Sequence, residues 1–261
     1  MRRFRRGSLF GKYRIEKRLG EGAFATVYQA LDTLEGLRVA LKVPHAEVLD
    51  PETEAAVLHE VRLAARLRHP RLLPLKAADR IDGRIVLVYP LGERTLEDRL
   101  RLRLGFAKAL SYFEALLEGV AAVHEHRVIH CDIKPENLIF VEGELLLADF
   151  GIAKIATRTI RASGSGTVGY CAPEQAMGKP SFRSDVFSTG LVGYRMMAGA
   201  LPEWPFDWPP PGIKRLRTHA SQGLVDLLKR SIELDPKKRF ASGPAMLRAF
   251  ERIRVKERRR K

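Results

Sequence analysis

The sequence predicts an α+β fold in two parts, a small antiparallel sheet with one helix and then a larger, mostly helical part. Short alternations of apolar and polar residues, typical of strands, dominate the first ninety residues. Long helical patterns replace them after "PLGE" at 90–93. We therefore expect a joint near Pro90 to Glu93, lobes at 13–90 and 91–253, and basic extensions at 1–12 and 254–261.

The first part is expected to hold five strands and one helix. The helix pattern, "DPETEAAVLHEVRLAARLRH" at 50–69, has Asp50 as a cap, Pro51 in the first turn and an apolar stripe at 57, 61 and 64. Turns that contain glycine separate several of the strands. The strand patterns are "YRIEKRLG" at 13–20, "ATVYQALD" at 25–32, "LRVALKVP" at 37–44, "RLLPLKAA" at 71–78 and "RIVLVYP" at 84–90.

The second part is expected to be mostly helical. Between its helices, the stretch 200–220 contains five prolines, which makes a long helix unfavourable there. We expect Trp204, Phe206 and Trp208 in this stretch to form a local cap rather than an exposed contact. The helical patterns cover 107–126, 184–199, 221–234 and 243–255, and the one at 184–199 is apolar nearly all round, as in a buried helix.

Composition narrows the class of protein. A chain of 261 residues, 45% hydrophobic, is long enough for one or two domains with a sizeable core. Its two cysteines, Cys131 and Cys171, cannot build a framework of disulfides, which favours reduced thiols. No apolar run approaches the roughly 20 residues that a membrane span needs, and "MRRFRRGSLF" lacks the apolar stretch of a signal peptide. We expect a cytoplasmic protein.

The net charge of +15 is concentrated at the ends of the chain, in "RRFRR" and "RIRVKERRRK". One interpretation is an electrostatic contact with an anionic partner, such as nucleic acid, anionic lipid or an acidic protein. The other is a pair of solvated tails. We favour the tails, because no aromatic stacking pattern accompanies the charge.

Polar side chains gather in the stretch "VIHCDIKPENLIF" at 128–140, between two apolar runs. Pro135 disfavours a regular element at its centre. The sequence therefore predicts a short, stiff loop that carries His130, Asp132, Lys134 and Asn137 between buried segments.

A second candidate site follows the first expected strand. In "LGEGAFATV", Gly20 and Gly22 would let the backbone approach a phosphate, although a hairpin turn needs glycine for its own sake. Lys42 in "VALK" lies inside an apolar strand, where it either reaches solvent or meets an anion. Glu60, on the apolar stripe of the expected helix, is the best available partner for Lys42, ahead of Glu54.

These motifs together resemble the eukaryotic-type serine/threonine protein kinases, particularly the bacterial ones, over nearly the whole chain. They occur in the family's order: the glycine loop, "VALK", Glu60, "HCDIKPEN", "DFG" at 149–151, "APE" at 172–174, "SDVFSTG" and Arg239 in "DPKKRF". One departure is Ala25 in place of the third glycine. The resemblance implies a bilobal protein-kinase-like fold and transfer of the ATP γ-phosphate to hydroxyl groups of a protein substrate.

The resemblance also implies roles for single residues. Asp132 would accept or orient the substrate hydroxyl proton, and Lys134 would neutralise charge on the transferring phosphoryl group. Lys134 is typical of the Ser/Thr-specific branch. Asn137 and Asp149 would hold Mg²⁺. The residues implied to bind ATP are Leu19, Gly20, Gly22, Val27, Ala40, Lys42, Glu60, Tyr89 and Leu91.

Other motif residues are expected to be structural. The resemblance implies an ion pair between Glu174 and Arg239, and Asp185 would anchor the backbone of the polar loop. His130 and Phe150 would belong to a packed hydrophobic column. Cys131 stands where many relatives have an arginine that pairs with a phosphate on the activation segment, so we expect a non-RD type of kinase with little dependence on that phosphate.

Two alternatives remain open from the sequence. A pseudokinase scaffold would bind ATP without turnover, but Lys42, Asp132, Asn137 and Asp149 are all present. A kinase-fold enzyme for small molecules is disfavoured by "GTVGYCAPE", which resembles the family's platform for protein substrates.

Overall fold

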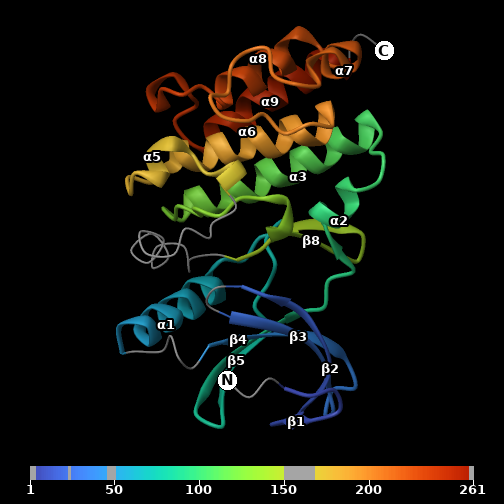
Figure 1. Cartoon of the computed structure of the whole chain (residues 1–261), viewed down its shortest axis with the longest axis vertical. Coiled ribbons are helices and arrows are strands. Elements are labelled where there is room, and N and C mark those ends of the chain that lie inside the picture. The colour runs from blue at the N-terminus through green and yellow to red at the C-terminus, as the bar shows by residue number, and fades with distance from the viewer. Residues whose placement is uncertain (1–3, 23–24, 46–50, 150–167, 259–261) are drawn as a thin grey trace. The chain divides into compact units, whose positions relative to one another are not determined.

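The structure, a computed structural model, describes residues 4–22, 25–45, 51–149 and 168–258, without the side chains of 51–53, 56, 60, 168 and 255–258. The chain divides into two compact units. The sheet unit comprises residues 1–68 and 73–93, and the helical unit comprises 69–72 and 94–261. Figure 1 shows the elements of each unit.

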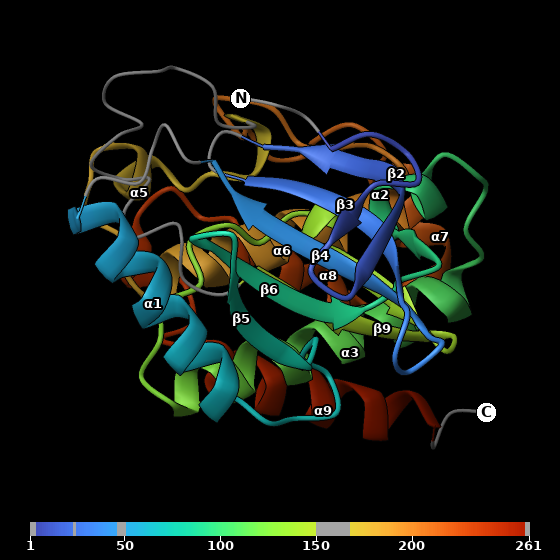
Figure 2. The same cartoon turned by 90° about the horizontal axis from the view of Figure 1, so that it is seen from below.

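The sheet unit is built on one antiparallel sheet of six strands in the order β1-β2-β3-β4-β6-β5. Figure 2 shows β2, β3, β4, β6 and β5 side by side. The helix of this unit is α1, Pro51–Arg66, which begins at the proline expected in its first turn. The strands are β1 (Leu9–Phe10), β2 (Tyr13–Glu21), β3 (Ala25–Asp32), β4 (Arg38–Pro44), β5 (Ala77–Ile81) and β6 (Arg84–Pro90).

The additional strand, β1, lies in the segment expected to be a basic extension. Its two residues pair with β2, and Phe10 is buried in the core of the sheet unit. The ring of Phe4 packs against Phe10 at a centroid distance of 4.5 Å and against Tyr28 at 5.3 Å. The expectation of a solvated N-terminal tail is therefore wrong for Phe4 and Phe10, whose rings add apolar area to the core, whereas Arg5 and Arg6 between them are exposed.

The strand expected at 71–78 is displaced along the chain. β5 begins at Ala77 instead, because Pro74 has no N–H to donate to a neighbouring strand. Leu72, which precedes the proline, belongs to the helical unit and forms an isolated parallel bridge with Leu147 of the same unit. The other four expected strands form within one residue of the predicted limits.

The pairing register separates the two faces of the sheet. Tyr28 and Ala30 of β3, Val39 and Leu41 of β4 and Val88 of β6 share the face that holds the unit's hydrophobic core. Alternate residues on the same strands point to the opposite face, since side chains change face at every residue. Because the hydrophobic core covers the first face, side chains that do not belong to this core can occupy the second face.

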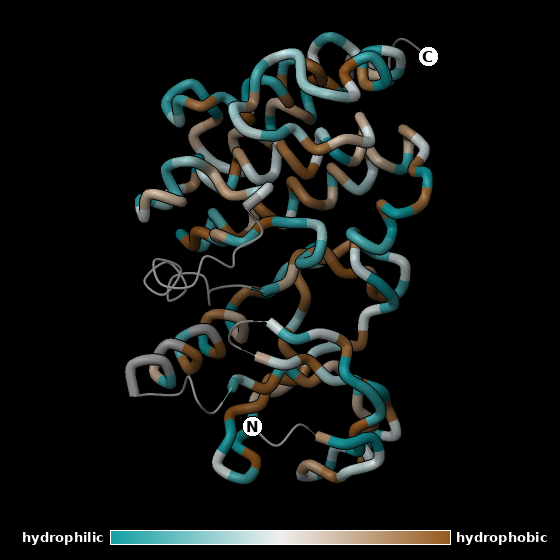
Figure 3. The backbone as a smooth tube through the Cα atoms, in the orientation of Figure 1, coloured by the Kyte–Doolittle hydropathy of each residue, from teal (hydrophilic) through white to brown (hydrophobic). Residues whose placement is uncertain are grey.

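The helical unit surrounds two buried helices, α3 (Phe106–Glu125) and α6 (Phe182–Ala198). In Figure 3 both helices contain brown, hydrophobic residues among white and teal ones, and nearly every residue of α6 from Ser184 onward is buried. None of the described helices is long and apolar enough to span a bilayer. The remaining elements are β7 (Arg94–Thr95), α2 (Leu96–Leu100), η2 (Pro135–Asn137), β8 (Leu138–Val141), β9 (Glu144–Leu147), η3 (Val168–Tyr170), α5 (Pro173–Ala176), α7 (Ile213–His219), α8 (Gln222–Ser231), η4 (Pro236–Lys238) and α9 (Gly243–Arg258).

The proline-rich stretch contains only the short helix α7, as the five prolines predict. Phe206 packs edge-on against Phe187 of α6 at 5.1 Å, and Trp208 packs against Tyr194 of α6 at 6.2 Å. The expected cap over α6 therefore forms from these two rings. Trp204 lies at the edge of this cap: its ring is 6.0 Å from that of Phe206, and 70% of its surface is exposed.

The crossing of α3 and α6 depends on a missing side chain. A Cβ built at Gly193 of α6 would lie 2.4 Å from Cε2 of Phe113, which is fully buried on α3. Any residue with a Cβ at position 193 would clash with Phe113, so the two helices can pack this closely only because the residue is glycine. The close approach fixes the position of α6, which carries Asp185 toward the polar loop at 130–137.

We predict that Gly193→Ala lowers the free energy of unfolding by about 1–3 kcal/mol, the usual cost of overpacking a core. Helix propensity alone would raise it by roughly 0.5–1 kcal/mol. The matched control is Gly223→Ala in α8, where the nearest atom to the new Cβ is Cγ1 of Ile253 at 3.4 Å. Urea unfolding of both variants checks the prediction, and a more stable Gly193→Ala variant would contradict it.

Candidate functional site

Four of the predicted nucleotide-binding residues lie on one face of the sheet. Val27 pairs with Lys42, and Ala40 pairs with Tyr89, in the β3–β4 and β4–β6 registers. Residues directly opposite each other in an antiparallel pair share a face, and so do residues two apart on a strand. Val27, Ala40, Lys42 and Tyr89 therefore occupy the face opposite the hydrophobic core.

Lys42 is a buried cation within this group, with 7% of its surface exposed. Burying an ammonium group costs free energy unless an anion or several hydrogen-bond acceptors contact it. The burial of Lys42 is therefore consistent with a negatively charged partner. The predicted partner, Glu60, belongs to α1, but its side chain lies outside the described residues. The Lys42–Glu60 pair stays a prediction.

The predicted glycine loop is described at Leu19, Gly20 and Gly22. A Cβ at Gly20 would meet no heavy atom within 4 Å, and the φ angle of Gly20 is not positive. Neither packing nor backbone strain in the described structure therefore requires a glycine at position 20. Gly22 donates its N–H to the carbonyl of Ala25 over 2.9 Å, which closes the hairpin beside the loop.

The flanking residues of this half are less enclosed. Leu19 is exposed, with 46% of its surface accessible, and Leu91 after β6 is half-buried. Both lie in the sheet unit with the four residues of the shared face. Their predicted contact with ATP remains a prediction.

The polar loop of the helical unit alternates between buried and half-buried residues from 131 to 137. Cys131, Ile133, Pro135 and Asn137 are buried, whereas Asp132, Lys134 and Glu136 are half-buried. The buried set packs the loop into the unit, and the 3₁₀ turn η2 begins at Pro135, whose fixed φ suits a first helical position. The loop is stiff because every second side chain is anchored.

The carboxylate of Asp132 is held between an ammonium and an amide. Lys134 Nζ lies 2.9 Å from Oδ1 of Asp132. Asn137 Nδ2 donates to Oδ2 and also to the backbone carbonyl of Asp132, both over 2.8 Å. Side chains two and five residues apart thus converge on one carboxylate, which keeps 43% of its side-chain surface exposed.

Asp149 is brought to the same region by β8 and β9. The N–H of Ala148 donates to the carbonyl of Asn137 over 2.9 Å, and Asp149 is the next residue. Asp149 is exposed and has a φ of 65°, a left-handed conformation that is uncommon outside glycine. Among the described residues, no group of three or more His, Cys, Asp or Glu side chains forms a metal site by itself.

The structure anchors the polar loop to α6 through the buried carboxylate of Asp185. The N–H of His130 donates to Oδ2 over 2.7 Å, and the N–H of Cys131 donates to Oδ1 over 2.8 Å. His124 Nε2 donates to Oδ2 over 2.8 Å, because its Nδ1 accepts the N–H of Gly243. The predicted anchoring role of Asp185 is confirmed.

His130 is a structural residue, as predicted. It is fully buried, and its Nε2 lies 2.9 Å from the carbonyl of Ala148. Its Nδ1 accepts the N–H of Asp132 over 3.3 Å, so the ring joins the loop to the residue before Asp149. The other predicted column member, Phe150, lies outside the described residues, as do Thr157, Thr159, Ser163, Ser165 and Thr167 of the expected activation segment.

One contact at Cys131 was not foreseen from the sequence. Cys131 is buried and has a φ of 65°. Gln175 Nε2, from α5, donates to the Cys131 carbonyl over 2.6 Å. Together with Asp185 on the N–H side, Gln175 holds both polar groups of this left-handed residue. The sequence held no signal for it, since Gln175 lies 44 residues further along the chain.

The ion pair of Glu174 and Arg239 forms as predicted. Arg239 donates to both carboxylate oxygens of Glu174, over 2.7 and 3.1 Å, and to the carbonyls of Arg183, Glu233 and Leu234. Ser184 also donates to Glu174 over 2.7 Å. Burial raises the pKa of Glu174, but the hydrogen bonds from Arg239 and Ser184 outweigh it and leave the pKa below its usual value.

Comparison with known proteins identifies the arrangement. The family model described as "Protein kinase domain" matches residues 13–250. The chain belongs to the protein kinase family. The match covers both units, and so this kinase contains the family's sheet lobe and helical lobe.

Curated relatives of this kinase include fungal and bacterial proteins. The carbon catabolite-derepressing protein kinase of Candida glabrata is 31% identical over 90% of this chain and 40% of its own length. The Aurora kinase of Schizosaccharomyces pombe is 31% identical over 88% of this chain and 69% of its own length. The serine/threonine-protein kinase PknH of Mycobacterium tuberculosis is 30% identical over 95% of this chain and 43% of its own length. The chain thus spans about two fifths of the length of the first and third of these relatives and about two thirds of the length of the second.

A solved structure confirms the fold. The crystal structure of the Mycobacterium tuberculosis PknI kinase domain matches this kinase with a TM-score of 0.73. The match covers 96% of this chain and 99% of that one, at 24% identity. The predicted bilobal protein-kinase-like fold is confirmed, with six strands in the sheet in place of five.

We predict that Glu174→Gln lowers the free energy of unfolding by about 3 kcal/mol, because it leaves the buried guanidinium of Arg239 without an opposite charge. Urea unfolding at neutral pH measures the loss. The control is Glu203→Gln, an exposed acid of the helical unit with no ion pair among the described residues. Equal stability of the two variants would contradict the prediction.

The same pair predicts a dependence on pH. Because the folded pKa of Glu174 is lowered, its stabilisation is fully present above the unfolded value of about 4.3 and is lost as the pH falls through the folded pKa. The difference in unfolding free energy between wild type and Glu174→Gln should be constant above about pH 5 and narrow below it. A difference that widens on acidification would show the opposite sign.

Proposed function

We propose that the chain is an ATP-dependent serine/threonine protein kinase that transfers the γ-phosphate of ATP to hydroxyl groups of a protein substrate. One observation supports the proposal best. The carboxylate of Asp132 is exposed on a loop that Asp185 anchors, and Lys134 and Asn137 hold it in place. Phosphoryl transfer requires mainly positioning and charge stabilisation, which such a loop can supply.

In the proposed reaction, Asp132 accepts the proton of the substrate hydroxyl. The hydroxyl oxygen bonds to the γ-phosphorus while the bond to the β,γ-bridging oxygen breaks, and ADP leaves. Lys134, whose ammonium contacts Asp132, neutralises charge on the phosphoryl group during the transfer. Its position two residues after Asp132 supports serine and threonine as the acceptors, through the resemblance to that branch of the family.

The sheet unit is proposed to bind the nucleotide. Lys42 contacts the α- and β-phosphates and pairs with Glu60, and Val27 and Ala40 pack against adenine from the same face of the sheet. Tyr89 is the gatekeeper, and the backbone at Leu91 meets the adenine edge. Gly20 and Gly22, with Leu19, cover the phosphates. These assignments make 13–90 the nucleotide-binding lobe and 91–253 the catalytic and substrate-binding lobe.

Asn137 and Asp149 are the residues proposed to hold Mg²⁺. Both hydrogen bonds of Asn137 Nδ2 go to Asp132, and this orientation leaves Oδ1, a suitable ligand for a hard cation, as the remaining polar atom of the amide. Asp149 adds an exposed carboxylate near the backbone of Asn137. When bound, the ion would neutralise negative charge on the phosphate oxygens.

The other features of the chain support a narrower set of proposals. Cys131 and Cys171 are free thiols, which suits a reducing compartment and the proposed cytoplasmic location. Burial raises the pKa of Cys171, which disfavours a reactive thiolate there. For the basic residues around 2–6 and at 254–261 we favour solvated charge, and contact with an anionic partner is the alternative proposal. Residues 254–258 of the expected C-terminal tail belong to α9.

Cys131 supports a non-RD catalytic loop. A thiol cannot supply the cation that would pair with an activation-segment phosphate. Gln175 and Asp185 instead hold the Cys131 peptide from both sides, and Glu174 fixes the neighbouring segment to Arg239. We propose that these contacts, none of which involves a phosphate, order this part of the helical unit.

We predict that the purified chain, incubated with labelled ATP and Mg²⁺, labels serine and threonine but not tyrosine, and that Asp132→Asn loses the activity. Lys42→Ala and Asp149→Ala should each lose about a hundredfold or more in rate, since each contact of this kind is worth roughly 3 kcal/mol. The control is Lys237→Ala, an exposed lysine of η4.

Three outcomes would contradict the assignment. ATP binding by wild type without any transfer indicates the pseudokinase scaffold. Transfer only to small molecules indicates the kinase-fold phosphotransferase. More than a third of the wild-type rate in Lys42→Ala or Asp149→Ala shows that these residues do not have the proposed roles.

We predict that activity depends little on activation-segment phosphorylation. Initial rates on an exogenous substrate are measured after full dephosphorylation, and with Thr157, Thr159, Ser163 and Ser165 changed to alanine. Both samples should keep the wild-type rate within about threefold, since no arginine stands beside Asp132 to read the phosphate. A loss of tenfold or more in both, restored in the first by rephosphorylation, would reveal the switch that Cys131 argues against.

A further inference from the structure

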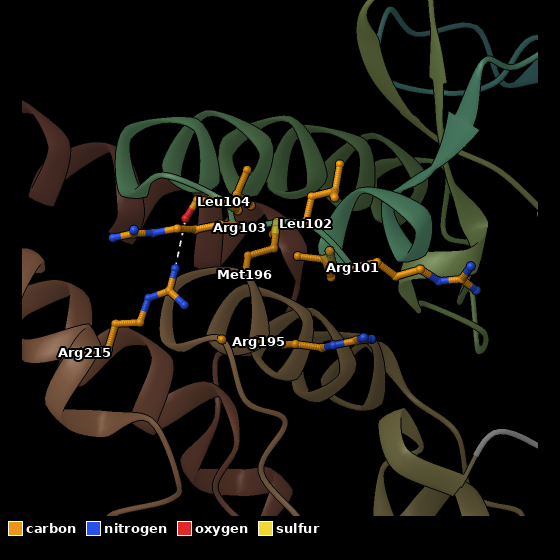
Figure 4. Close-up of a pocket in the computed structure, with 9 residues that line it drawn as sticks. Arg101, Leu102, Arg103, Leu104, Arg195, Met196 and Arg215 are labelled. Carbon is orange, nitrogen blue, oxygen red and sulfur yellow. Dashed lines mark hydrogen bonds between the residues drawn. The ribbon is translucent and has the colours of Figure 1, made fainter.

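The helical unit contains a basic pocket away from the polar loop. It lies where the α2–α3 connection meets the C-terminal end of α6 and the helix α7, and its volume is about 250 Å³. Figure 4 shows that four arginines line it, namely Arg101, Arg103, Arg195 and Arg215. Their charge makes the pocket a candidate anion site.

Two of these arginines already have acidic partners. Arg195 donates to both oxygens of Glu97, with 2.9 Å between Nη2 and Oε1, and to the hydroxyl of Tyr170. Arg101 lies 3.7 Å from Asp98. Figure 4 shows both of their guanidinium groups directed toward the same end of the pocket. These two side chains are accounted for by structural ion pairs.

Arg103 and Arg215 lie at the other end of the pocket in Figure 4. Neither has a carboxylate within 4 Å among the residues that the structure describes. Arg215 uses one N–H to hold the carbonyl of Leu104 over 2.9 Å, which places its guanidinium beside the backbone next to Arg103. Two like charges at one end of a pocket repel each other, and an anion bound by both would remove that repulsion.

The two chain segments that supply Arg103 and Arg215 are rich in cations. The stretches 99–108 and 212–219 contain no aspartate or glutamate. Leu102, with 63% of its surface exposed, and Met196 provide apolar contacts within the pocket, and no aromatic ring lines it. The cations of the two stretches are Arg99, Arg101, Arg103, Lys108, Lys214, Arg215 and Arg217.

We propose that this pocket docks an acidic segment, rich in Asp and Glu, of a protein substrate. The proposal rests on the proposed kinase function for the word substrate, but not for the binding itself. A pocket lined by four arginines, two of which contact no carboxylate among the described residues, suits several carboxylates in sequence, because each carboxylate can accept a bidentate pair. The missing aromatic platform disfavours a single-stranded nucleic acid.

The direct test measures binding without ATP. Two fluorescent serine peptides are used, identical except for a tail of glutamates in one and of glutamines in the other, together with an oligothymidylate of the same charge as the acidic peptide. Wild type should bind the acidic peptide at least about tenfold more tightly than the glutamine peptide at low salt. Oligothymidylate should bind more weakly than the acidic peptide.

The variants are Arg103→Gln alone and Arg103→Gln with Arg215→Gln. Arg103→Gln carries the test, because the Arg103 side chain makes no described hydrogen bond or ion pair whose loss would unfold the protein. The control for the single variant is Lys237→Gln, and the control for the double variant is Lys237→Gln with Lys238→Gln. These lysines lie in η4, whose neighbour Arg239 contacts Arg183 at the start of α6. The pocket is at the other end of this 17-residue helix, about 25 Å away along its axis.

We expect Arg103→Gln to weaken binding of the acidic peptide about fivefold or more, and the double variant to weaken it further, with less than about twofold change in the controls. Binding of the glutamine peptide should not change. Equal losses in pocket and control variants, no preference of wild type for the acidic peptide, or tighter binding of oligothymidylate that also depends on Arg103 would each overturn the proposal.

A kinetic arm separates this proposal from the proposed function. With both peptides as substrates, Arg103→Gln should raise KM for the acidic peptide about fivefold, and leave kcat and the KM of the glutamine peptide unchanged. If neither peptide is phosphorylated by wild type, the proposed function fails, while the binding measurements still decide whether the pocket takes an acidic segment.

Discussion

The buried carboxylate of Asp185 is the contact on which the candidate site depends. It accepts the N–H groups of two consecutive loop residues, His130 and Cys131, and a ring N–H of His124. A fully buried carboxylate with three donors is satisfied only in one arrangement of its partners. Because α6 is itself fixed against α3 at Gly193, the position of that helix is transmitted through Asp185 to the loop that carries Asp132.

The contacts that hold Cys131 and Glu174 in the helical unit have a common consequence for regulation. Gln175 and Asp185 hold the peptide of Cys131 from both sides, and Arg239 holds Glu174 with the help of Ser184. None of these contacts needs a phosphate. An arginine at position 131, by contrast, could have paired with a phosphate on the activation segment. Cys131 can therefore occupy a position that is critical for the fold of the loop while supplying no charge.

Much of the fold and of the site could be predicted from the sequence, because both depend on local patterns. β3 has the predicted limits, since its alternation is regular, and the four site residues of the loop come from one short motif. β1 was missed because two residues carry no periodicity, and β5 was displaced by Pro74. The contacts of His124 and Gln175 join residues 61 and 44 positions apart, where only the tertiary structure brings them together.

Amide hydrogen exchange at His130 and Cys131, compared between wild type and Asp185→Asn, tests the central claim most directly. Removal of the charge should raise exchange at these two amides by about tenfold or more and lower kcat, while KM for ATP stays within about threefold. Exchange elsewhere in α3 and α6 should change less, which separates loss of the anchor from loss of the fold. Unchanged protection at both amides, with an unchanged kcat, would show that Asp185 does not position the loop.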